Sequence, residues 1–278
     1  MSVSASPATA TATSAPPPRT AATEAAWSAL HAATTAPYQR HGRFAWHFAR
    51  GKLGRDPVFR GLLEHGLLPP DAHLVDIGSG QSLLASLQHQ IDQLVARQGW
   101  PAEWPPAPVR GRYTGIELMP RDVERARAAL ADLPSAPQLV CADMCQQALP
   151  PCQVVVILDV LHYVDHAAQA ALLARVHAAL TPGGRLLLRV GDAAARRGFA
   201  ISQWVDRLVT LVRGHRVPPT FGRNLAEWQA LLHGLGFAVR ALPMSQGTPF
   251  ANVLLVADKV ANKAASKAAN SAAGGAAA

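Results

Sequence analysis

Hydrophobic residues in the middle of the chain occur in two patterns: short unbroken runs, and longer segments in which they recur every three or four positions. The unbroken runs predict strands at 74–77, 112–116, 138–142, 154–158 and 185–190. The helically spaced segments predict helices at 83–98, 120–133 and 165–180. Strands that alternate with helices in this way predict an α/β fold, a doubly wound and mostly parallel sheet with helices on both faces.

The C-terminal third of the chain departs from this alternation. Apolar spacing predicts helices at 199–213 and 225–235, and two strands follow at 237–241 and 252–257 with only a loop between them. Two strands joined in this way pair antiparallel, so we expect them to add a hairpin to the sheet. The complete prediction is a seven-stranded sheet whose last strand is antiparallel.

A helical extension is predicted before the first strand. One short helix fits 24–33, and another begins after Asp56 as its N-cap, with Pro57 at its first position. Between them, 37–53 has the pattern of one amphipathic helix rich in aromatic and basic residues. We interpret 24–69 as an N-terminal helical region that either folds over a ligand as a lid or packs on the sheet.

Composition changes at both ends of the chain. Residues 1–23 are mostly Ala, Thr, Ser and Pro, and residues 259–278 are mostly Ala, Lys, Asn, Ser and Gly, so both are predicted to be disordered tails of a domain over 70–258. The N-terminus lacks the basic start and apolar block of a secretory signal, and no apolar run is as long as a membrane span. The cytoplasm is therefore the expected location.

The formal net charge of +8 comes mostly from arginines spread along the chain. This charge suits an acidic partner or an anionic substrate and is equally typical of a solvated basic surface. No dense basic run is interleaved with aromatic residues, so nucleic-acid binding is not expected. Cys141, Cys145 and Cys152 are odd in number and poorly spaced for a disulfide framework or a zinc site, so we expect free thiols and no metal.

The most informative stretch is 73–84, which predicts a strand, a tight glycine turn at Gly78–Gly80 and the start of a helix. Glycines let a ligand lie against the backbone, and a helix N-terminus offers free N–H groups. Asp76 would repel the pyrophosphate of a dinucleotide and attract an ammonium or sulfonium group. Leu83 occupies the third glycine position of the dinucleotide motif, which also disfavours that ligand. An ordinary strand-to-helix turn without a ligand is the alternative.

Three further acids stand at the ends of predicted strands: Glu117, Asp143 and Asp159. In an open parallel sheet the carboxyl ends of neighbouring strands face one crevice, in which ligands bind. We therefore expect Asp76 and these three acids to line one ligand site.

The order of motifs around these acids resembles the Rossmann-like, class I S-adenosylmethionine-dependent methyltransferases over residues 70–258. The matching motifs are Val75-Asp76-Ile77-Gly78-Ser79-Gly80, Gly115-Ile116-Glu117, Ala142-Asp143-Met144, Leu158-Asp159-Val160-Leu161-His162-Tyr163 and Leu180-Thr181-Pro182-Gly183-Gly184-Arg185. The resemblance implies S-adenosylmethionine as cofactor. The binding residues that it implies are Asp76, Gly78, Ser79, Gly80, Glu117, Leu118, Asp143, Met144, Asp159 and Val160. One departure is Ser82, where the family often has glycine.

The resemblance also implies which part of the cofactor each residue meets. The glycine turn admits the methionine part and the ribose, while Asp76 holds the methionine ammonium group, directly or through water. Glu117 accepts both ribose hydroxyls, which needs a bidentate carboxylate. Asp143 takes the adenine amine, and the Met144 backbone N–H donates to a ring nitrogen.

The segment after the fourth strand is expected to line the methionine side of the cofactor and to supply the catalytic groups. Asp159 and Val160 line that side by the same resemblance, and His162 and Tyr163 follow beside the expected methyl group. Either side chain can take or relay a proton from an acceptor hydroxyl or an activated carbon. The alternative is that His162 caps a turn and Tyr163 is part of the wall.

The expected acceptor is a small molecule. The stretch 42–52, Gly-Arg-Phe-Ala-Trp-His-Phe-Ala-Arg-Gly-Lys, looks like methyltransferases of bacterial aryl polyene pigment clusters. That resemblance implies secondary metabolism and an aromatic ring or its hydroxyl as acceptor, delivered by an acidic acyl-carrier protein that would suit the basic surface. A quinone-like ring is equally compatible. A lid would bring to the pocket His41, Arg43, His47 and Arg50. The competing classes are a nucleotide-dependent oxidoreductase, a non-catalytic protein on the same fold and a nucleic-acid methyltransferase.

Overall fold

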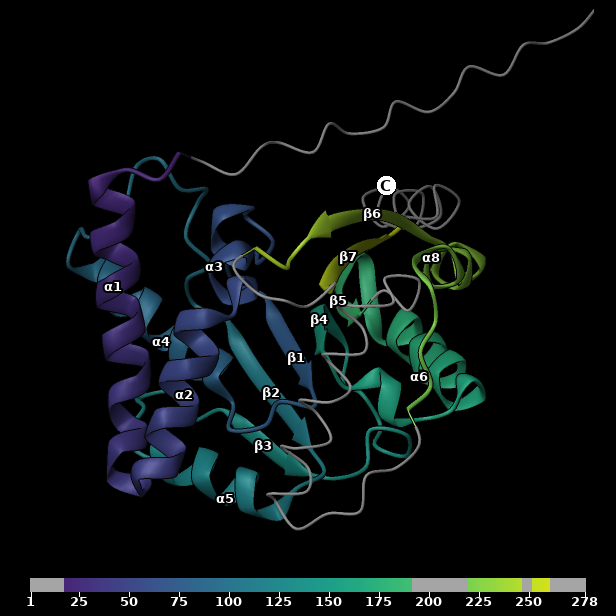
Figure 1. Cartoon of the computed structure of the whole chain (residues 1–278), viewed down its shortest axis with the longest axis horizontal. Coiled ribbons are helices and arrows are strands. Elements are labelled where there is room, and N and C mark those ends of the chain that lie inside the picture. The colour runs from purple at the N-terminus through teal and green to yellow at the C-terminus, as the bar shows by residue number, and fades with distance from the viewer. Residues whose placement is uncertain (1–17, 192–219, 247–251, 261–278) are drawn as a thin grey trace, which may run out of the picture.

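A computed structural model describes residues 18–191, 220–246 and 252–260, so the helix predicted at 199–213 lies outside the described residues. A seven-stranded sheet runs through the molecule in the order β3-β2-β1-β4-β5-β7-β6 (Figure 1). Its strands are β1 (His73–Ile77), β2 (Arg112–Glu117), β3 (Gln138–Cys141), β4 (Cys152–Leu158), β5 (Leu180–Gly191), β6 (Phe237–Pro243) and β7 (Asn252–Lys259). Neighbours among β1 to β5 pair in parallel, whereas β7 runs antiparallel to both β5 and β6. The predicted sheet with an antiparallel last strand is confirmed.

Helices cover both faces of the sheet. They are α1 (Ala21–Thr35), the 3-10 helix η1 (Ala36–His41), α2 (Arg43–Arg55), α3 (Pro57–Glu64), α4 (Leu83–Ala96), α5 (Pro120–Ala129), the 3-10 turn η2 (Leu161–Tyr163), α6 (His166–Ala179) and α8 (Leu225–Gly234). Figure 1 shows α1, α2 and α4 on one side of the sheet and α6 and α8 on the other. Leu74 and Val156 belong to the buried cluster on the first side, and Val75 and Val155 to the cluster on the second, as the alternation of side chains along a strand requires.

The N-terminal helices differ in detail from the prediction. α1 begins at Ala21, because Thr20 and Thr23 form a reciprocal capping box, and the helix therefore reaches into the predicted tail. The single helix predicted over 37–53 is instead η1 followed by α2. The break falls at Gly42, whose φ of +100° is incompatible with an α-helix.

The same helices contribute to the core of the sheet. Leu30 of α1, Leu53 of α2 and Leu62 of α3 are buried in the apolar cluster that contains Leu74 of β1. In this structure the N-terminal region packs on the sheet.

The residues between the predicted helix at 165–180 and the predicted strand at 185–190 lie inside β5. Leu180 pairs with Cys152 and Arg185 pairs with Val154, so residues 181–184 bulge out between the two pairs. Strand β5 resumes at Arg185, the residue at which the strand was predicted to begin.

Candidate functional site

The acids predicted to line one site lie at one edge of the sheet. β1 pairs with β2 on one side and β4 on the other, and β2 pairs with β3, so the carboxyl ends of all four strands are neighbours. The chain order reverses between β1 and β4, and open α/β sheets have a crevice at such a point. Strand β1 is buried throughout, whereas Gly78, Glu117, Asp143 and Asp159 are partly exposed.

The glycine turn after β1 is closed at one end and open at the other. The N–H groups of Gly78 and Ser79 donate to the Ile116 carbonyl oxygen at 2.8 and 3.1 Å, which holds the turn against β2. Gly78 and Gly80 have φ angles of +73° and +55°, which favour glycine. A Cβ on Gly78 would lie 2.5 Å from a Val160 methyl group, while in the described part of the chain nothing lies within 4 Å of a Cβ on Gly80. A ligand can therefore approach the backbone at Gly80.

Glu117, at the end of β2, faces the open end of the turn. Its Oε2 accepts the Gly80 N–H at 2.8 Å, and its Oε1 accepts the Met119 N–H at 2.9 Å. These bonds fix the carboxylate, yet each oxygen keeps a second lone pair for a further donor. Leu118 beside it is 61% exposed, which is unusual for a leucine and leaves an apolar surface at the same edge.

Asp143 and Met144 follow β3 at the far end of the rim. Asp143 Oδ1 accepts the Cys145 N–H at 2.8 Å, which shapes the turn between them. The Met144 carbonyl oxygen accepts a hydrogen bond of 2.5 Å from Arg175 Nη2 of α6. The backbone at Met144 is thus held from the α6 side of the sheet.

Asp76, the acid that precedes the turn, is nearly inaccessible, with 6% of its surface exposed. The Tyr113 hydroxyl of β2 donates to its Oδ2 at 2.7 Å. Burial raises the pKa of Asp76 to about 7, although the Tyr113 hydrogen bond lowers it and the charge of Glu117 raises it further. Sequence reasoning treats Asp76 as a permanent anion, whereas in the structure its charge changes near neutral pH.

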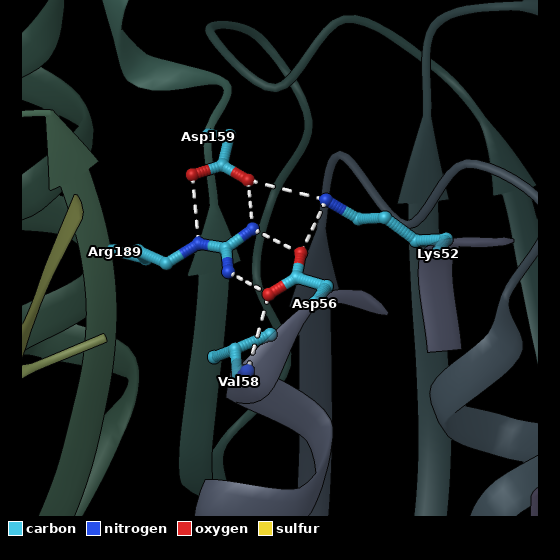
Figure 2. A network of polar contacts seen from close by, with 5 residues as sticks. All are labelled: Lys52, Asp56, Val58, Asp159 and Arg189. Atoms are coloured by element: carbon cyan, nitrogen blue, oxygen red, sulfur yellow. Dashed lines mark hydrogen bonds and ion pairs between the residues drawn. The ribbon is translucent and has the colours of Figure 1, made fainter. Parts of the chain in front are cut away.

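Asp159, at the end of β4, belongs to a cluster of ion pairs (Figure 2). Arg189 of β5 donates from Nε to Asp159 Oδ1 at 2.8 Å and from Nη2 to Asp56 Oδ2 at 2.7 Å, and makes one further contact to each carboxylate. Lys52 Nζ of α2 lies 2.8 Å from Asp56 Oδ2 and 3.3 Å from Asp159 Oδ2. Asp56 also caps α3, as predicted, by accepting the Val58 N–H at 3.1 Å. Two cations and two carboxylates therefore join the N-terminal helices to the ends of β4 and β5.

The cluster is shielded from water most strongly at Arg189, whose side chain is 1% exposed. Burial raises the pKa of Asp56 and of Asp159, but Arg189 and Lys52 outweigh it and hold both pKa values below the usual range of a carboxyl group. Asp159 also has a φ of +61°, a left-handed conformation that Asp tolerates better than most residues. The carboxylate assigned to the methionine side is thus engaged by cations of the chain itself.

Sequence reasoning missed Lys52, Tyr113 and Arg189. Arg189 carried a signal, because it is a single charge within the apolar run 186–190, and a buried charge requires a partner. The basic stretch of α2 indicated the correct helix, but the residue that reaches a strand-end acid is Lys52. Arg43, His47 and Arg50 are exposed, and Arg50 lies over the Trp46 ring at 4.9 Å.

The two candidate proton carriers form the turn η2 directly after the rim. The ring centroids of His162 and Tyr163 lie 4.1 Å apart, and both residues are partly exposed. The His162 carbonyl oxygen accepts the Phe221 N–H at 2.8 Å, which ties the turn to the segment before α8. Asp165 caps α6 by accepting the Ala168 N–H at 2.8 Å, so its carboxylate has a structural role.

Two of the three cysteines lie beside this rim, Cys141 opposite Glu117 in the sheet and Cys145 next to Asp143. Cys141 is exposed, Cys145 is half-buried and Cys152 is buried, and all three are free thiols. Among the described residues, no group of His, Cys, Asp and Glu is arranged to hold a metal ion. In the same residues, no helix combines the length and the apolar character that crossing a membrane requires.

Together, the strand order, the glycine turn and the acids at the carboxyl edge define a Rossmann-like fold with a candidate ligand site at that edge. Residues 75–186 match a family described as a methyltransferase domain. This match agrees with the resemblance of the sequence motifs to the class I, S-adenosylmethionine-dependent methyltransferases.

Two curated relatives match a short part of the chain. They are the carboxy-S-adenosyl-L-methionine synthases of Geobacter metallireducens and Aeromonas hydrophila, which are 38% and 39% identical over 77 residues. The match covers 26% and 27% of this chain, and only 31% of the length of each relative.

Solved structures show the same fold over most of the chain. The mitomycin 7-O-methyltransferase MmcR has a TM-score of 0.54 and 23% identity, and the comparison covers 87% of this chain and 69% of that one. The pyocyanin biosynthetic protein PhzM has a TM-score of 0.53 and 19% identity over 80% of this chain and 61% of that one. Magnesium protoporphyrin IX methyltransferase ChlM from Synechocystis has a TM-score of 0.51 and 17% identity over 85% and 99%.

Proposed function

We propose that this protein transfers a methyl group from S-adenosylmethionine to a small-molecule acceptor. The observation that carries the proposal is the pairing of Glu117 with the open end of the glycine turn at Gly80. A fixed carboxylate with spare lone pairs suits a ribose diol, and the absent Cβ admits a ligand at the same place. The match of residues 75–186 to a methyltransferase domain supports the same ligand.

The other rim residues fit the remaining parts of this cofactor. Asp143 and the Met144 backbone would hold the adenine end, with Leu118 as an apolar surface beside them. Asp76 would accept the ammonium group, and Val160, which lies against Gly78, would line the methionine side. The rim is built from carboxylates and glycines, which suits a cationic ligand without phosphate better than a dinucleotide.

The chain's own contribution to the reaction would be position, exclusion of water and proton transfer. When bound, the cofactor supplies an electrophilic methyl group on sulfur, so the protein needs no nucleophile of its own. The partly exposed His162 and Tyr163 follow the rim and would take a proton from an acceptor hydroxyl. The cluster of Lys52, Asp56, Asp159 and Arg189 would hold the N-terminal helices in place beside them.

The acceptor that we propose is an aromatic ring or its hydroxyl, in secondary metabolism of the aryl polyene type. The support is the sequence of α2 together with its surface: Arg43, Arg50 and Arg55 are exposed, and the helix contains no acidic residue. Such a surface complements an acidic acyl-carrier protein that delivers the acceptor. A free phenol or quinone-like ring that is methylated without a carrier is the alternative outcome.

Calorimetry with S-adenosylmethionine and S-adenosylhomocysteine tests the cofactor. We expect Glu117→Ala to weaken both ligands by at least about tenfold, since it removes a charge-assisted pair of hydrogen bonds. Glu124→Ala, which removes an exposed carboxylate from α5, is the matched control and should bind as the parent does. Absence of heat with the parent protein would contradict the proposed function.

The acceptor class is tested by mass spectrometry. The parent protein is incubated with S-adenosylmethionine and a panel of phenols, each offered both free and attached to a carrier protein. We expect one methyl group to be added, faster on the carrier-bound acceptors and more slowly at high salt, because screening weakens the attraction of the two surfaces. Equal rates on free and carrier-bound acceptors would remove the carrier from the proposal.

A further inference from the structure

Tyr113 is a buried side chain that no motif of the site includes. It lies in β2 opposite Leu74, whereas Asp76 lies opposite Gly115. Residues two apart along a strand share one face of a sheet, so the Tyr113 side chain is a diagonal neighbour of Asp76 on the same face. Its hydroxyl reaches Asp76 Oδ2 at 2.7 Å.

Gly115 provides the space for this contact. A Cβ at that position would lie 2.9 Å from Ser79 Oγ, 3.0 Å from Tyr113 Cε1 and 3.1 Å from Ser82 Oγ. The glycine therefore allows the tyrosine ring and the two serines of the turn to meet beside Asp76. The two serine hydroxyls also contact each other, since Ser82 Oγ donates to Ser79 Oγ at 3.2 Å.

The charges around Asp76 indicate which kind of group completes this arrangement. From β2, the Tyr113 hydroxyl and the Glu117 carboxylate face it, and Tyr38 of η1 and Ser82 at the start of α4 face Tyr113 in turn. The groups in the described part of the chain that shift the pKa of Asp76 include no cation. A buried carboxylate without a cation favours a positively charged ligand.

We propose that Tyr113 is a positioning residue of the cofactor site, whose hydroxyl holds the Asp76 carboxylate ionised and oriented to receive the ammonium group of the cofactor. The inference rests on the proposed function, because it takes the ammonium group of S-adenosylmethionine as the ligand of Asp76. Tyr113 itself acts only through Asp76.

The consequence is that cofactor binding is linked to a proton. Asp76 has a pKa of about 7 without ligand, so below that pH a cationic group must displace the proton of its carboxyl group. Affinity therefore rises with pH and levels off above the midpoint. Removal of the Tyr113 hydroxyl takes away a bond that lowers the pKa of Asp76, so the midpoint moves to higher pH.

The test is calorimetric titration with S-adenosylhomocysteine between about pH 5 and about pH 8, in buffers of different ionisation enthalpy, which count the released protons. We expect the parent to release protons below the midpoint, and Tyr113→Phe to raise the midpoint by about one pH unit, with about tenfold weaker binding below it. Asp76→Asn should show no midpoint of this kind.

Tyr38→Phe is the matched control. Tyr38 is a second fully buried tyrosine, but its hydroxyl donates to the Gln81 carbonyl oxygen at 2.7 Å and not to Asp76. If the buried phenols serve only stability, both variants should lower stability and leave the midpoint unchanged, and that result would overturn the proposal. A midpoint that moves only in Tyr113→Phe supports it.

A second measurement on the parent protein keeps the proposal testable if Tyr113→Phe does not fold. The carboxylic acid band of Asp76 in the infrared spectrum, identified by its loss in Asp76→Asn, should disappear when S-adenosylhomocysteine binds near pH 6. A band that persists in the complex would overturn the proposal. A parent protein that does not bind the ligand at all would instead overturn the proposed function.

Discussion

At the scale of single residues, the site depends on backbone conformations that most side chains avoid. Ser82 has a φ of +54° and is fully buried at the N-terminus of α4. The left-handed region costs a residue with a Cβ about 1–2 kcal/mol, which explains why the family often has glycine at this position. Here the hydroxyl of Ser82 offsets part of that cost by its hydrogen bond to Ser79.

The stability of the protein should report the burial of Asp76. A carboxyl group whose pKa is raised from 3.8 to about 7 by folding contributes stability below the unfolded value, and that contribution is lost as the pH rises through the folded value. Asparagine does not titrate, so Asp76→Asn should not lose this stability as the pH rises. We expect the free energy of unfolding of the variant, relative to the parent, to be about 2–4 kcal/mol more favourable at pH 8 than at pH 4. Urea unfolding without ligand measures it, and an equal effect at both pH values would contradict the burial of this carboxyl group.

Gly80 should separate ligand binding from stability. An alanine there has free space around its Cβ but must adopt a φ of +55°, so we expect a loss of stability of about 1–2 kcal/mol. Its methyl group would occupy the space for the ligand, and the affinity for S-adenosylhomocysteine should fall at least about tenfold.

The control for Gly80→Ala is Gly183→Ala in the bulge of β5. Gly183 also has a positive φ, +76°, with free space around its Cβ in the described structure. Both variants should therefore lose similar stability in thermal unfolding, and only Gly80→Ala should lose affinity. A comparable loss of affinity in Gly183→Ala would show that backbone strain alone weakens binding.

At the scale of elements, the cluster around Arg189 determines how the N-terminal helices meet the sheet. Its members come from α2, from the N-cap of α3, and from the ends of β4 and β5. Asp159 is held by ion pairs, and the next residue, Val160, lies against Gly78. The position of the helices is thus connected to the wall of the proposed cofactor site.

Removal of Arg189 should be costly because two carboxylates lose their main partner. We expect Arg189→Met to lower the free energy of unfolding near pH 7 by about 3–5 kcal/mol, the usual result of breaking a buried pair. Burial disfavours the charged form of Asp56 and Asp159, but Arg189 and Lys52 favour it and lower both pKa values. The stabilisation that these ion pairs provide is therefore present at neutral pH and is lost when acid protonates the two carboxylates.

Arg185→Met is the matched control for Arg189→Met. Arg185 lies four positions earlier in β5 and pairs with Asp258 at 2.6 Å, where both side chains are partly exposed. Exposed pairs contribute less than about 1 kcal/mol, so this variant should unfold almost as the parent does. Both free energies of unfolding are measured by urea unfolding. Equal losses in the two variants would show that the buried cluster stabilises the fold no more than an exposed ion pair does.

At the scale of the whole molecule, the N-terminal region and the sheet share one hydrophobic core. Leu30, Leu53 and Leu62 are buried in the same cluster as the strand residue Leu74. We expect a chain that lacks residues 1–69 to lose cooperative unfolding, because it exposes the apolar face that these helices cover. A chain that begins at Pro18 keeps every described helix and is the control. Cooperative unfolding of the shorter chain would show that 70–258 folds without the N-terminal helices.

The local features of the fold were predictable from the sequence. The strands, the helix N-caps at Asp56 and Asp165, and the reversed last strand follow from periodicity and turn chemistry over a few neighbouring residues. The break at Gly42 was missed, because the amphipathic pattern of 37–53 continues across it and a glycine within a helical pattern is only a weak signal.

The sequence by itself determined where the glycine turn and the strand-end acids lie, because parallel strands bring their carboxyl ends to one edge. Only the tertiary structure decided the partners of those acids. Asp159 meets Lys52 from 107 positions away, and Arg189 meets Asp56 from 133 positions away. Such contacts depend on how packed elements are placed in space, and the burial that shifts the pKa of Asp76 is likewise a property of the assembled core.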